Sequence, residues 1–370
     1  MNKKKYAIII IGVLTYVFIM LGQGRVPIEE VAIINGVGYD IERKGEGIIE
    51  YSMPISTNVY KPSGSQVNLL FKDEGLNLGE IIQQRQEKMD KKFIQGHERV
   101  ILISEDYARY GLKTMMEERV RNSEANDTAY MAVCKGKAED YLKYQKRGYM
   151  NASEYISGLI ETYGDYSFFS NNYKLIDAYV RIGAEGRSLV LPYINITEDG
   201  IEITGAAVFN EDKMVELADV KNGRILNLLK NDAVKGIISL QKSPKQYIDF
   251  DAKTSKRKVK CYRQGDKYSF IIDLSFTGTV SNNEMYVDMI KNINIQKEFE
   301  KDMAKSIESQ CYDFIKRMQN DYKIDCIELG KEAAAKYGRQ KGIDWNEVVS
   351  NADIKVNVKV KVDLQGRGDY

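Results

Sequence analysis

The pattern of hydrophobic and polar positions divides the chain into a short apolar beginning and a long mixed remainder. Three lysines, Lys3 to Lys5, precede a run without charge from Tyr6 to Gly22. A basic segment followed by an apolar one is typical of a secretory signal or a signal-anchor, whose lysines stay on the cytoplasmic side. As a helix, the run is about 25 Å long, slightly short of a hydrocarbon core of about 30 Å. A buried core helix is the less favoured alternative, because the run is terminal and follows lysines.

The first half of the remainder alternates between strand-like and helix-like periodicity. Glu29–Tyr39 and Gly47–Pro54 predict a hairpin around a polar turn that ends in glycine. Arg99–Ile103 is short and apolar on both faces, which indicates a strand in a sheet interior. A helix is expected over Glu105–Arg119 and another strand over Thr128–Cys134. This succession of strand, helix and strand favours a sheet with parallel members.

The second half predicts several strands followed by a long helix. Strands are expected at Tyr247–Asp251, Arg257–Tyr262 and Tyr268–Thr277, separated by polar turns. Ile295–Tyr322 carries one apolar stripe at helical spacing, and a core face is favoured over a partner-binding face. From Ile354 to Leu364, apolar residues alternate with polar ones that are mostly lysines. These lysines are best interpreted as protection of a sheet edge, and contact with anionic lipid is the alternative.

Composition narrows the possible classes. The formal net charge is +1 without a basic block, which argues against nucleic-acid binding. The part beyond the apolar run exceeds what one core usually organises, so more than one domain is expected. The four cysteines, Cys134, Cys261, Cys311 and Cys326, show neither CxxC pairing nor metal-type spacing. Free buried thiols are favoured, with a Cys311–Cys326 disulfide as the alternative.

Catalytic chemistry finds little support in the sequence. The single histidine, His97, excludes metal sites of the two- or three-histidine kind. It directly precedes the expected buried strand, so a structural hydrogen bond at the strand entrance is favoured over catalysis. No phosphate-binding loop occurs, and Gly36 and Gly38 lack the third glycine of a dinucleotide site. We therefore predict a protein that is not an enzyme, with no catalytic, cofactor-binding or metal-binding residues.

Four sequence blocks carry a resemblance to a known family. They are Val26–Asp40 (VPIEEVAIINGVGYD), Gly96–Gly111 (GHERVILISEDYARYG), Gly205–Val215 (GAAVFNEDKMV) and Asp344–Val362, which opens with DWNE and closes with IKVNVKVKV. In this order they are similar to the Ger(x)C family, the C-type subunits of spore germinant receptors. The blocks span nearly the whole chain after the apolar run, and their shared order carries the resemblance.

The resemblance implies a receptor part rather than an enzyme. Members are extracytoplasmic subunits tethered at the outer face of the spore inner membrane, needed for the nutrient response. Their partners are the multi-pass A-type and B-type receptor subunits, and no cofactor is implied. Two other classes stay open: an exported solute-binding protein would show a deep inter-domain cleft, and an exported hydrolase would show paired carboxylates in a pocket. For the receptor subunit we expect an exposed apolar patch on one domain face.

The fold implied by the resemblance is α+β, with three domains, mixed sheets and a long helix packed on a sheet in the C-terminal domain. We expect a signal or anchor segment at residues 1–24 and an N-terminal α/β domain at 25–195. A small middle domain at 200–240 and a C-terminal α+β domain at 241–370 follow.

One departure from the family concerns the N-terminal segment. Members normally carry a lipidated cysteine directly after a glycine, but here Gln23 occupies that place between Gly22 and Gly24. A glutamine has no thiol to acylate, so no lipidation site is predicted. Either the segment stays as a helical anchor, or a signal peptidase cuts after Gly24. We favour retention, because the implied receptor role needs a membrane tether.

Overall fold

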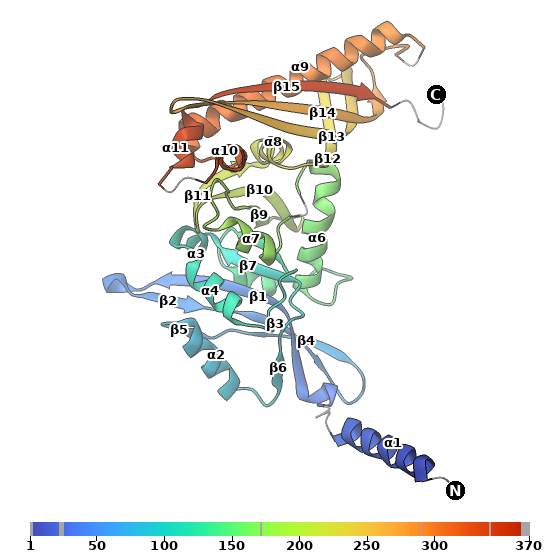
Figure 1. Cartoon of the computed structure of the whole chain (residues 1–370), viewed down its shortest axis with the longest axis vertical. Helices are drawn as coiled ribbons and strands as arrows, with labels where there is room; N and C mark the ends of the chain where they lie inside the picture. The colour runs from blue at the N-terminus through green and yellow to red at the C-terminus, as the bar shows by residue number, and fades with distance from the viewer. Residues whose placement is uncertain (1–2, 22–25, 171, 290, 340–341, 364–370) are drawn as a thin grey trace.

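The computed structural model describes residues 3–21, 26–170, 172–289, 291–339 and 342–363, which form an elongated molecule with two mixed sheets (Figure 1). Within these residues, the first sheet has eleven strands: β1 (Val31–Arg43), β2 (Ile49–Ser52), β3 (Ile55–Tyr60), β4 (Gln66–Phe71), β5 (Glu74–Gly75), β6 (Lys92–Ile94), β7 (Val100–Ser104), β8 (Tyr130–Cys134), β9 (Val190–Ile196), β10 (Ile201–Asn210) and β11 (Lys213–Asp219). The second sheet comprises β12 (Lys235–Ser243), β13 (Gln246–Gln264), β14 (Lys267–Asn283) and β15 (Asp353–Val362).

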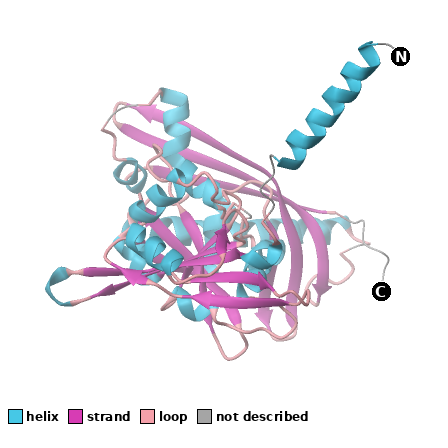
Figure 2. Cartoon of the chain, turned by 90° about the horizontal axis from the view of Figure 1, so that it is seen from below, coloured by secondary structure: helices cyan, strands magenta, loops and turns pink. Residues whose placement is uncertain are grey.

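The described helices surround these sheets, except for the first one. They are α1 (Lys3–Leu21), α2 (Leu78–Glu87), α3 (Glu105–Tyr110), α4 (Lys113–Arg121), α5 (Ala138–Leu142), α6 (Ala152–Ser167), α7 (Leu175–Arg181), α8 (Val220–Lys230), α9 (Ile293–Arg317), α10 (Leu329–Tyr337) and α11 (Trp345–Ser350). Figure 2 shows α1 projecting away from the body of the molecule. The expected α+β class, with a long C-terminal helix on a sheet, is confirmed.

The centre of the first sheet is parallel, as the sequence predicts. β1, β7, β8 and β9 lie side by side with parallel pairing. Every residue of β7 is buried, which explains why this strand is apolar on both faces. β1 and β2 form the predicted antiparallel hairpin, with Asp40 opposite Ser52.

Two layers of helices bury the two faces of this sheet. On one face, Val100 and Leu102 of β7 belong to a core that includes α5, α6 and α8. On the other face, Ile101 and Ile103 belong to a second core that includes α2, α3, α4 and α7. Alternate residues of one strand therefore serve two different cores.

The helix predicted over Glu105–Arg119 is wrong in one respect, because the structure breaks it at Gly111. This glycine has a φ of +134°, a conformation that ends α3 and that other residues rarely adopt. The turn is held from outside, since the backbone N–H of Lys113 donates to Asp212 at 3.0 Å. The separation into α3 and α4 thus depends on a contact between residues that are distant in the sequence.

The second sheet differs from prediction in β13, which is a single strand where two were expected. The polar residues between Asp251 and Arg257 continue the strand, with a bulge between Thr254 and Lys256. β15 pairs in parallel with β14, and its apolar side is buried as predicted, while the lysines are exposed. Leu364, the last residue of the expected strand, lies outside the described residues.

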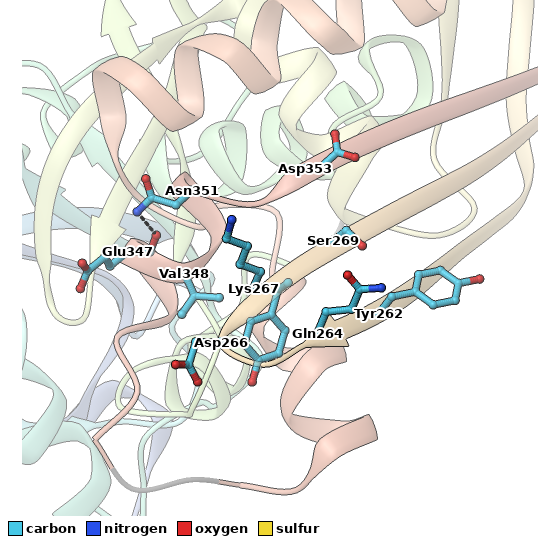
Figure 3. Close-up of a pocket in the computed structure, with 10 residues that line it drawn as sticks. Tyr262, Gln264, Asp266, Lys267, Ser269, Glu347, Val348, Asn351 and Asp353 are labelled. Atoms are coloured by element: carbon cyan, nitrogen blue, oxygen red, sulfur yellow. Dashed lines mark hydrogen bonds between the residues drawn. The ribbon is translucent and has the colours of Figure 1, made fainter.

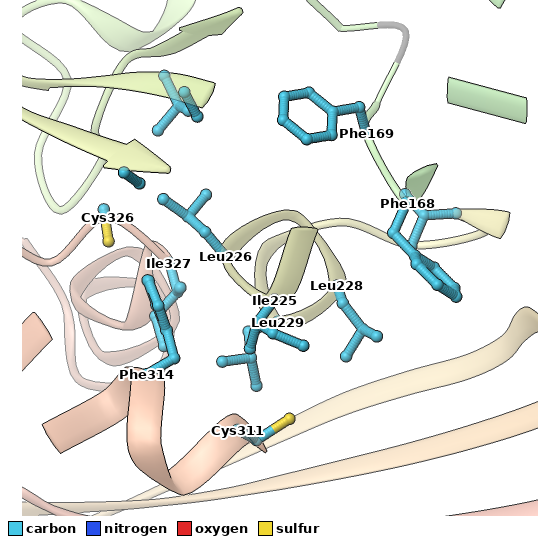
Figure 4. Packing of buried hydrophobic residues seen from close by; sticks show 14 of the residues in the cluster. Phe168, Phe169, Ile225, Leu226, Leu228, Leu229, Cys311, Phe314, Cys326 and Ile327 are labelled. Carbon is cyan, nitrogen blue, oxygen red and sulfur yellow. The ribbon is translucent and has the colours of Figure 1, made fainter. Parts of the chain in front are cut away.

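The long helix α9 packs with its apolar stripe in the core, which confirms that interpretation. Figure 4 shows Cys311 and Phe314 of α9 beside α8, whose Leu226 and Leu229 are also buried. The helix ends at Arg317, and the last predicted turn is a π-helical segment, Met318–Tyr322. Because α8 contacts both β10 and α9, one continuous core joins the two sheets.

The free edge of β15 is covered by α9. The backbone N–H groups of Val356, Val358 and Val362 donate to side chains of Tyr312 (3.1 Å), Glu308 (2.9 Å) and Glu300 (3.0 Å), respectively. These N–H groups point away from β14, so without α9 they would be available to another strand. The helix therefore closes this edge of the sheet.

All four cysteines are free and buried, as the favoured interpretation had it. The division into three domains stays a prediction. β9 and β10 are antiparallel neighbours in one sheet across residues 196–201, so the first expected boundary falls within a hairpin.

Candidate functional site

A buried ion cluster connects α7 and α8 with the segment that precedes α10. Glu328 precedes α10, and its carboxylate lies 3.3 Å from the Arg181 guanidinium of α7 and 3.3 Å from the Lys230 ammonium of α8. Burial acts against the charge on Glu328, but the two cations hold its pKa below the usual range. Lys230 also donates to the backbone carbonyl of Ser188 at 2.6 Å. These two ion pairs fix the position of Glu328 against the first sheet.

A cavity of about 490 Å³ lies beside this cluster, lined by residues 183–188, the turn after β10, Asp325 and residues 342–346. Its polar groups bond across the junction. Trp345 donates to Glu185 at 3.1 Å, and the Asn346 amide donates to Asn210 at 3.0 Å. The N–H of Asp325 donates to Asn346 at 2.9 Å. The first two of these bonds connect α11 and its start to the loops of the first sheet across the cavity.

Two carboxylates have raised pKa values, but they serve separate helices. Burial raises the pKa of Asp40 to about 6, and the same cause raises the pKa of Asp325 to about 6. Asp40 accepts the N–H groups of Ala138 and Glu139 at the start of α5. Asp325 accepts those of Leu329 and Gly330 at the start of α10. Each carboxylate therefore caps a helix, and the two do not form the acid–base pair of a hydrolase.

The structure corrects the role expected for His97. This residue is exposed in the loop before β7. Its neighbour Glu98 is 1% exposed and makes the bonds at the strand entrance instead. Glu98 accepts the N–H of Gly96 at 2.9 Å and pairs with Arg119 at 3.4 Å. Among the described residues, no group of three or more metal-ligating side chains converges.

A second cavity, of about 720 Å³, opens at one end of the second sheet. Figure 3 shows its walls, which come from the turn between β13 and β14, from α11 and from the start of β15. Lys267, Glu347 and Asp353 bring charge to it, and Tyr262 adds an aromatic ring that is 47% exposed. This mixture suits recognition of a polar partner better than enclosure of an apolar ligand.

The most extensive exposed apolar surface belongs to α1 rather than to a domain face. Ile9, Ile10 and Ile11 are all more than half exposed, and they point in three directions around the helix. Elsewhere, large exposed apolar side chains occur singly or in pairs, such as Val287 and Ile293 near the start of α9. Across the described residues, no helix combines the length and the apolar character needed to cross a bilayer. Gln23, with Gly22 and Gly24, lies outside the described residues.

The class of protein follows from comparison with known families. The model for the spore germination protein N-terminal domain matches residues 24–196. The model described as spore germination B3/GerAC-like, C-terminal, matches residues 204–366. Together the two matches take in nearly the whole chain, in the order seen in the family. The chain belongs to the Ger(x)C family of spore germinant receptor subunits.

Individual relatives agree with this placement. The chain is 23% identical to the spore germination protein GerQC of Bacillus cereus, over 92% of this chain and 93% of that protein. It is 20% identical to the putative spore germination protein YfkR of Bacillus subtilis (strain 168), over 82% and 80% of the two chains. The crystal structure of the GerBC protein has the same fold, with a TM-score of 0.57 and 16% identity over 88% of this chain and 97% of that one.

Proposed function

We propose that this protein is the non-enzymatic, extracytoplasmic subunit of a spore germinant receptor, required for nutrient-triggered germination. The observation that carries the proposal is the match of both family models, in order, over nearly the whole chain. Its partners are then the multi-pass A-type and B-type subunits, at the outer face of the spore inner membrane. The helix-capping roles of Asp40 and Asp325 also support a non-enzymatic subunit, because they give a structural role to the two carboxylates whose pKa values are raised.

The membrane tether in this proposal is α1. A helix that exposes apolar side chains in all directions is poorly suited to water, and insertion into lipid removes that surface from it. The absence of a cysteine at Gln23 means that lipidation at this place does not supply the tether. Retention of α1 is therefore part of the proposed function.

A detergent pull-down of the tagged full-length chain from dormant spores tests the receptor role. We expect two multi-pass proteins to co-purify, and the N-terminus of the chain to begin within residues 1–24. Recovery of a lone protein that starts at Arg25 and stays free of membranes contradicts the proposal.

The role of α1 is tested separately with the purified chain and lipid vesicles. The variant Ile10→Asp/Leu14→Asp places two charges on α1 and is expected to abolish co-flotation with vesicles. The control Val287→Asp/Ile293→Asp makes the same change at exposed apolar residues elsewhere and is expected to float like the original chain. Equal flotation of both variants contradicts attachment through α1.

A further inference from the structure

The outer face of the second sheet carries two rows of lysines that the receptor role does not explain. One row lies on β13 and the other on β15, with β14 between them. Pairing of the strands places Lys256 and Lys359 on either side of Ser275, and Lys260 and Lys355 on either side of Ile271. The lysines of the two rows are Lys253, Lys256, Lys258 and Lys260 on β13 and Lys355, Lys359 and Lys361 on β15. Lysines two residues apart in a row are about 7 Å from each other, Asn357 separates Lys355 from Lys359, and the two rows are about 10 Å apart.

Acidic side chains neutralise these rows only in part: on the same face, Asp251 precedes the row on β13 and Asp353 precedes the row on β15. Asp273 on β14 is the acidic residue between them, and it pairs with Lys260 at 2.7 Å while accepting from Asn357 at 2.7 Å. The other six lysines have no ion pair within the described part of the chain. Since the whole chain has a formal net charge of only +1, this face concentrates positive charge that is balanced elsewhere.

Protection of the sheet edge, the interpretation favoured from sequence, does not account for the lysines of β15. The exposed N–H groups of this edge already donate to Glu300, Glu308 and Tyr312 of α9. A second strand therefore has no free edge to join here, with or without lysines. For the same reason, an acidic peptide cannot bind by extending the sheet at β15.

Contact with lipid headgroups, the other interpretation, conflicts with the position of the sheet. Figure 1 shows the second sheet and α1 at opposite ends of the long axis. When α1 lies in the membrane, as proposed above, the lysine rows are far from its surface, beyond the range of about 10 Å over which exposed charges act in salt. The anionic partner must then lie on the side away from the bilayer.

We propose that the outer face of the second sheet binds an extended anionic polysaccharide. The lane between the lysine rows runs along β14 through Ser269, Ile271, Asp273, Ser275 and Thr277, and its three hydroxyl side chains can exchange hydrogen bonds with sugar hydroxyls. The rows are open at the surface and suit a linear chain with repeated carboxylates rather than a single small ligand.

The end of the lane supports a sugar rather than a peptide as the partner. Near the end of the lane, Ser269 lies between Asp353 and Tyr262, and the Tyr262 ring is 47% exposed at the rim of the 720 Å³ cavity (Figure 3). The Lys336 ammonium lies over this ring, 5.0 Å from its centroid, and a flat aromatic face with a polar hydroxyl provides a stacking surface for a sugar ring. Nucleic acid, which needs several such rings for its bases, finds one aromatic side chain in this lane.

Binding of polygalacturonate, a linear sugar polymer with one carboxylate per unit, tests the proposal with the full-length chain in neutral detergent. We expect saturable binding that weakens as salt is raised, and none to fully methyl-esterified polygalacturonate, which keeps the sugar backbone and lacks the charge. Lys258→Gln/Lys355→Gln/Lys359→Gln is expected to weaken binding about tenfold, at a fraction of a kcal/mol per exposed lysine. The control Lys61→Gln/Lys113→Gln/Lys135→Gln removes the same charge from exposed lysines outside the second sheet and is expected to bind nearly as the original chain does.

Two further arms identify the partner. Tyr262→Ala is expected to weaken binding to polygalacturonate while leaving binding to poly-L-glutamate unchanged. Stronger binding to poly-L-glutamate than to polygalacturonate overturns the proposal in favour of an acidic peptide. An effect of the lysine substitutions on vesicles with phosphatidylglycerol, but not on polygalacturonate, overturns it in favour of lipid. Equal weakening of binding by both triple variants would mean that only the net charge of the protein matters, and it also overturns the proposal. None of these outcomes depends on recovery of the receptor partners, so the proposed function is tested independently.

Discussion

At the scale of single residues, buried charges in this protein are used to position backbone. Glu98 holds the loop before β7 by accepting the N–H of Gly96, and it pairs with Arg119 of α4. Arg119 is 4% exposed and also donates to the hydroxyl of Tyr39 at 2.6 Å. Removal of one member leaves the others buried with unsatisfied charge, which costs more than the pair itself contributes.

Glu98→Ala is therefore expected to lower the free energy of unfolding by about 3 kcal/mol, near the lower end for a broken buried pair because Glu118 and Tyr39 still contact Arg119. His97→Ala, one residue earlier but exposed, is expected to change it by less than about 0.5 kcal/mol. Urea unfolding of the full-length variants measures both values. A larger loss for His97→Ala than for Glu98→Ala would restore the strand-entrance role to the histidine.

The comparison of these two neighbours shows where residue-level prediction from sequence stops. A lone histidine attracts attention because of its possible chemistry, whereas Glu98 is one of many acidic residues. Its burial depends on Arg119, 21 positions later, and on the packing of α4 over the sheet. Likewise, nothing local to Asp325 indicates that it caps α10 and that burial raises its pKa to about 6.

At the scale of elements, the closed edge of β15 is the clearest cooperation between a helix and a strand. Three side chains along one side of α9 accept the N–H groups that the parallel pairing with β14 leaves free. The stripe and the alternating pattern were both visible in the sequence, and both elements are confirmed. The contact between α9 and β15 could not be predicted, because side chains such as Glu308 are interpreted as solvated when the partner strand is unknown.

Glu308→Ala/Tyr312→Phe is expected to accelerate hydrogen exchange of the Val356 and Val358 amides about fivefold, since each loses a hydrogen bond worth about 1 kcal/mol. Hydrogen exchange read by mass spectrometry on peptides from residues 353–362 measures the change. Glu298→Ala, an exposed substitution on the same helix, serves as the control and is expected to leave these peptides unchanged. Unaltered exchange in the double variant would show that water already reaches this edge.

Other elements were predictable only in part, for reasons that are also non-local. Gly111 ends α3, and the turn after it is held by Asp212. This residue accepts the N–H of Lys113, which lies 99 residues earlier in the chain. β13 continues through polar residues because β14 pairs with its whole length. Periodicity detects an amphipathic segment, but tertiary pairing decides where that segment begins and ends.

At the scale of the whole molecule, the two sheets meet at a junction that is packed like a core. α8 is buried between β10 and α9, and buried side chains run without interruption from Val100 to Ile354. The loop at residues 183–188 contributes a backbone contact, in which the carbonyl of Gly186 accepts the N–H of Lys331 at 3.0 Å. Such continuity predicts that the parts after α1 unfold together.

Gly186 offers a way to test this coupling. It has a φ of +64°, and an added Cβ would lie 2.2 Å from the backbone nitrogen of Lys331 and 2.3 Å from the carbonyl carbon of Gly330. Gly265, with a φ of +63°, has nothing within 4 Å of its added Cβ. Both Gly→Ala substitutions introduce the same backbone strain, of about 1 kcal/mol, and only Gly186→Ala also forces two backbone segments apart.

The sole tryptophan, Trp345, reports on that junction because it is 6% exposed and donates to Glu185. In the original chain and in Gly265→Ala, we expect urea unfolding followed by tryptophan fluorescence and by far-UV circular dichroism to coincide. In Gly186→Ala, the fluorescence transition is expected at lower urea than the circular dichroism transition, because the junction opens before the sheets unfold. Equal midpoints in Gly186→Ala and Gly265→Ala would mean that the junction yields to the added methyl group, and the coupling would then rest on α8 alone.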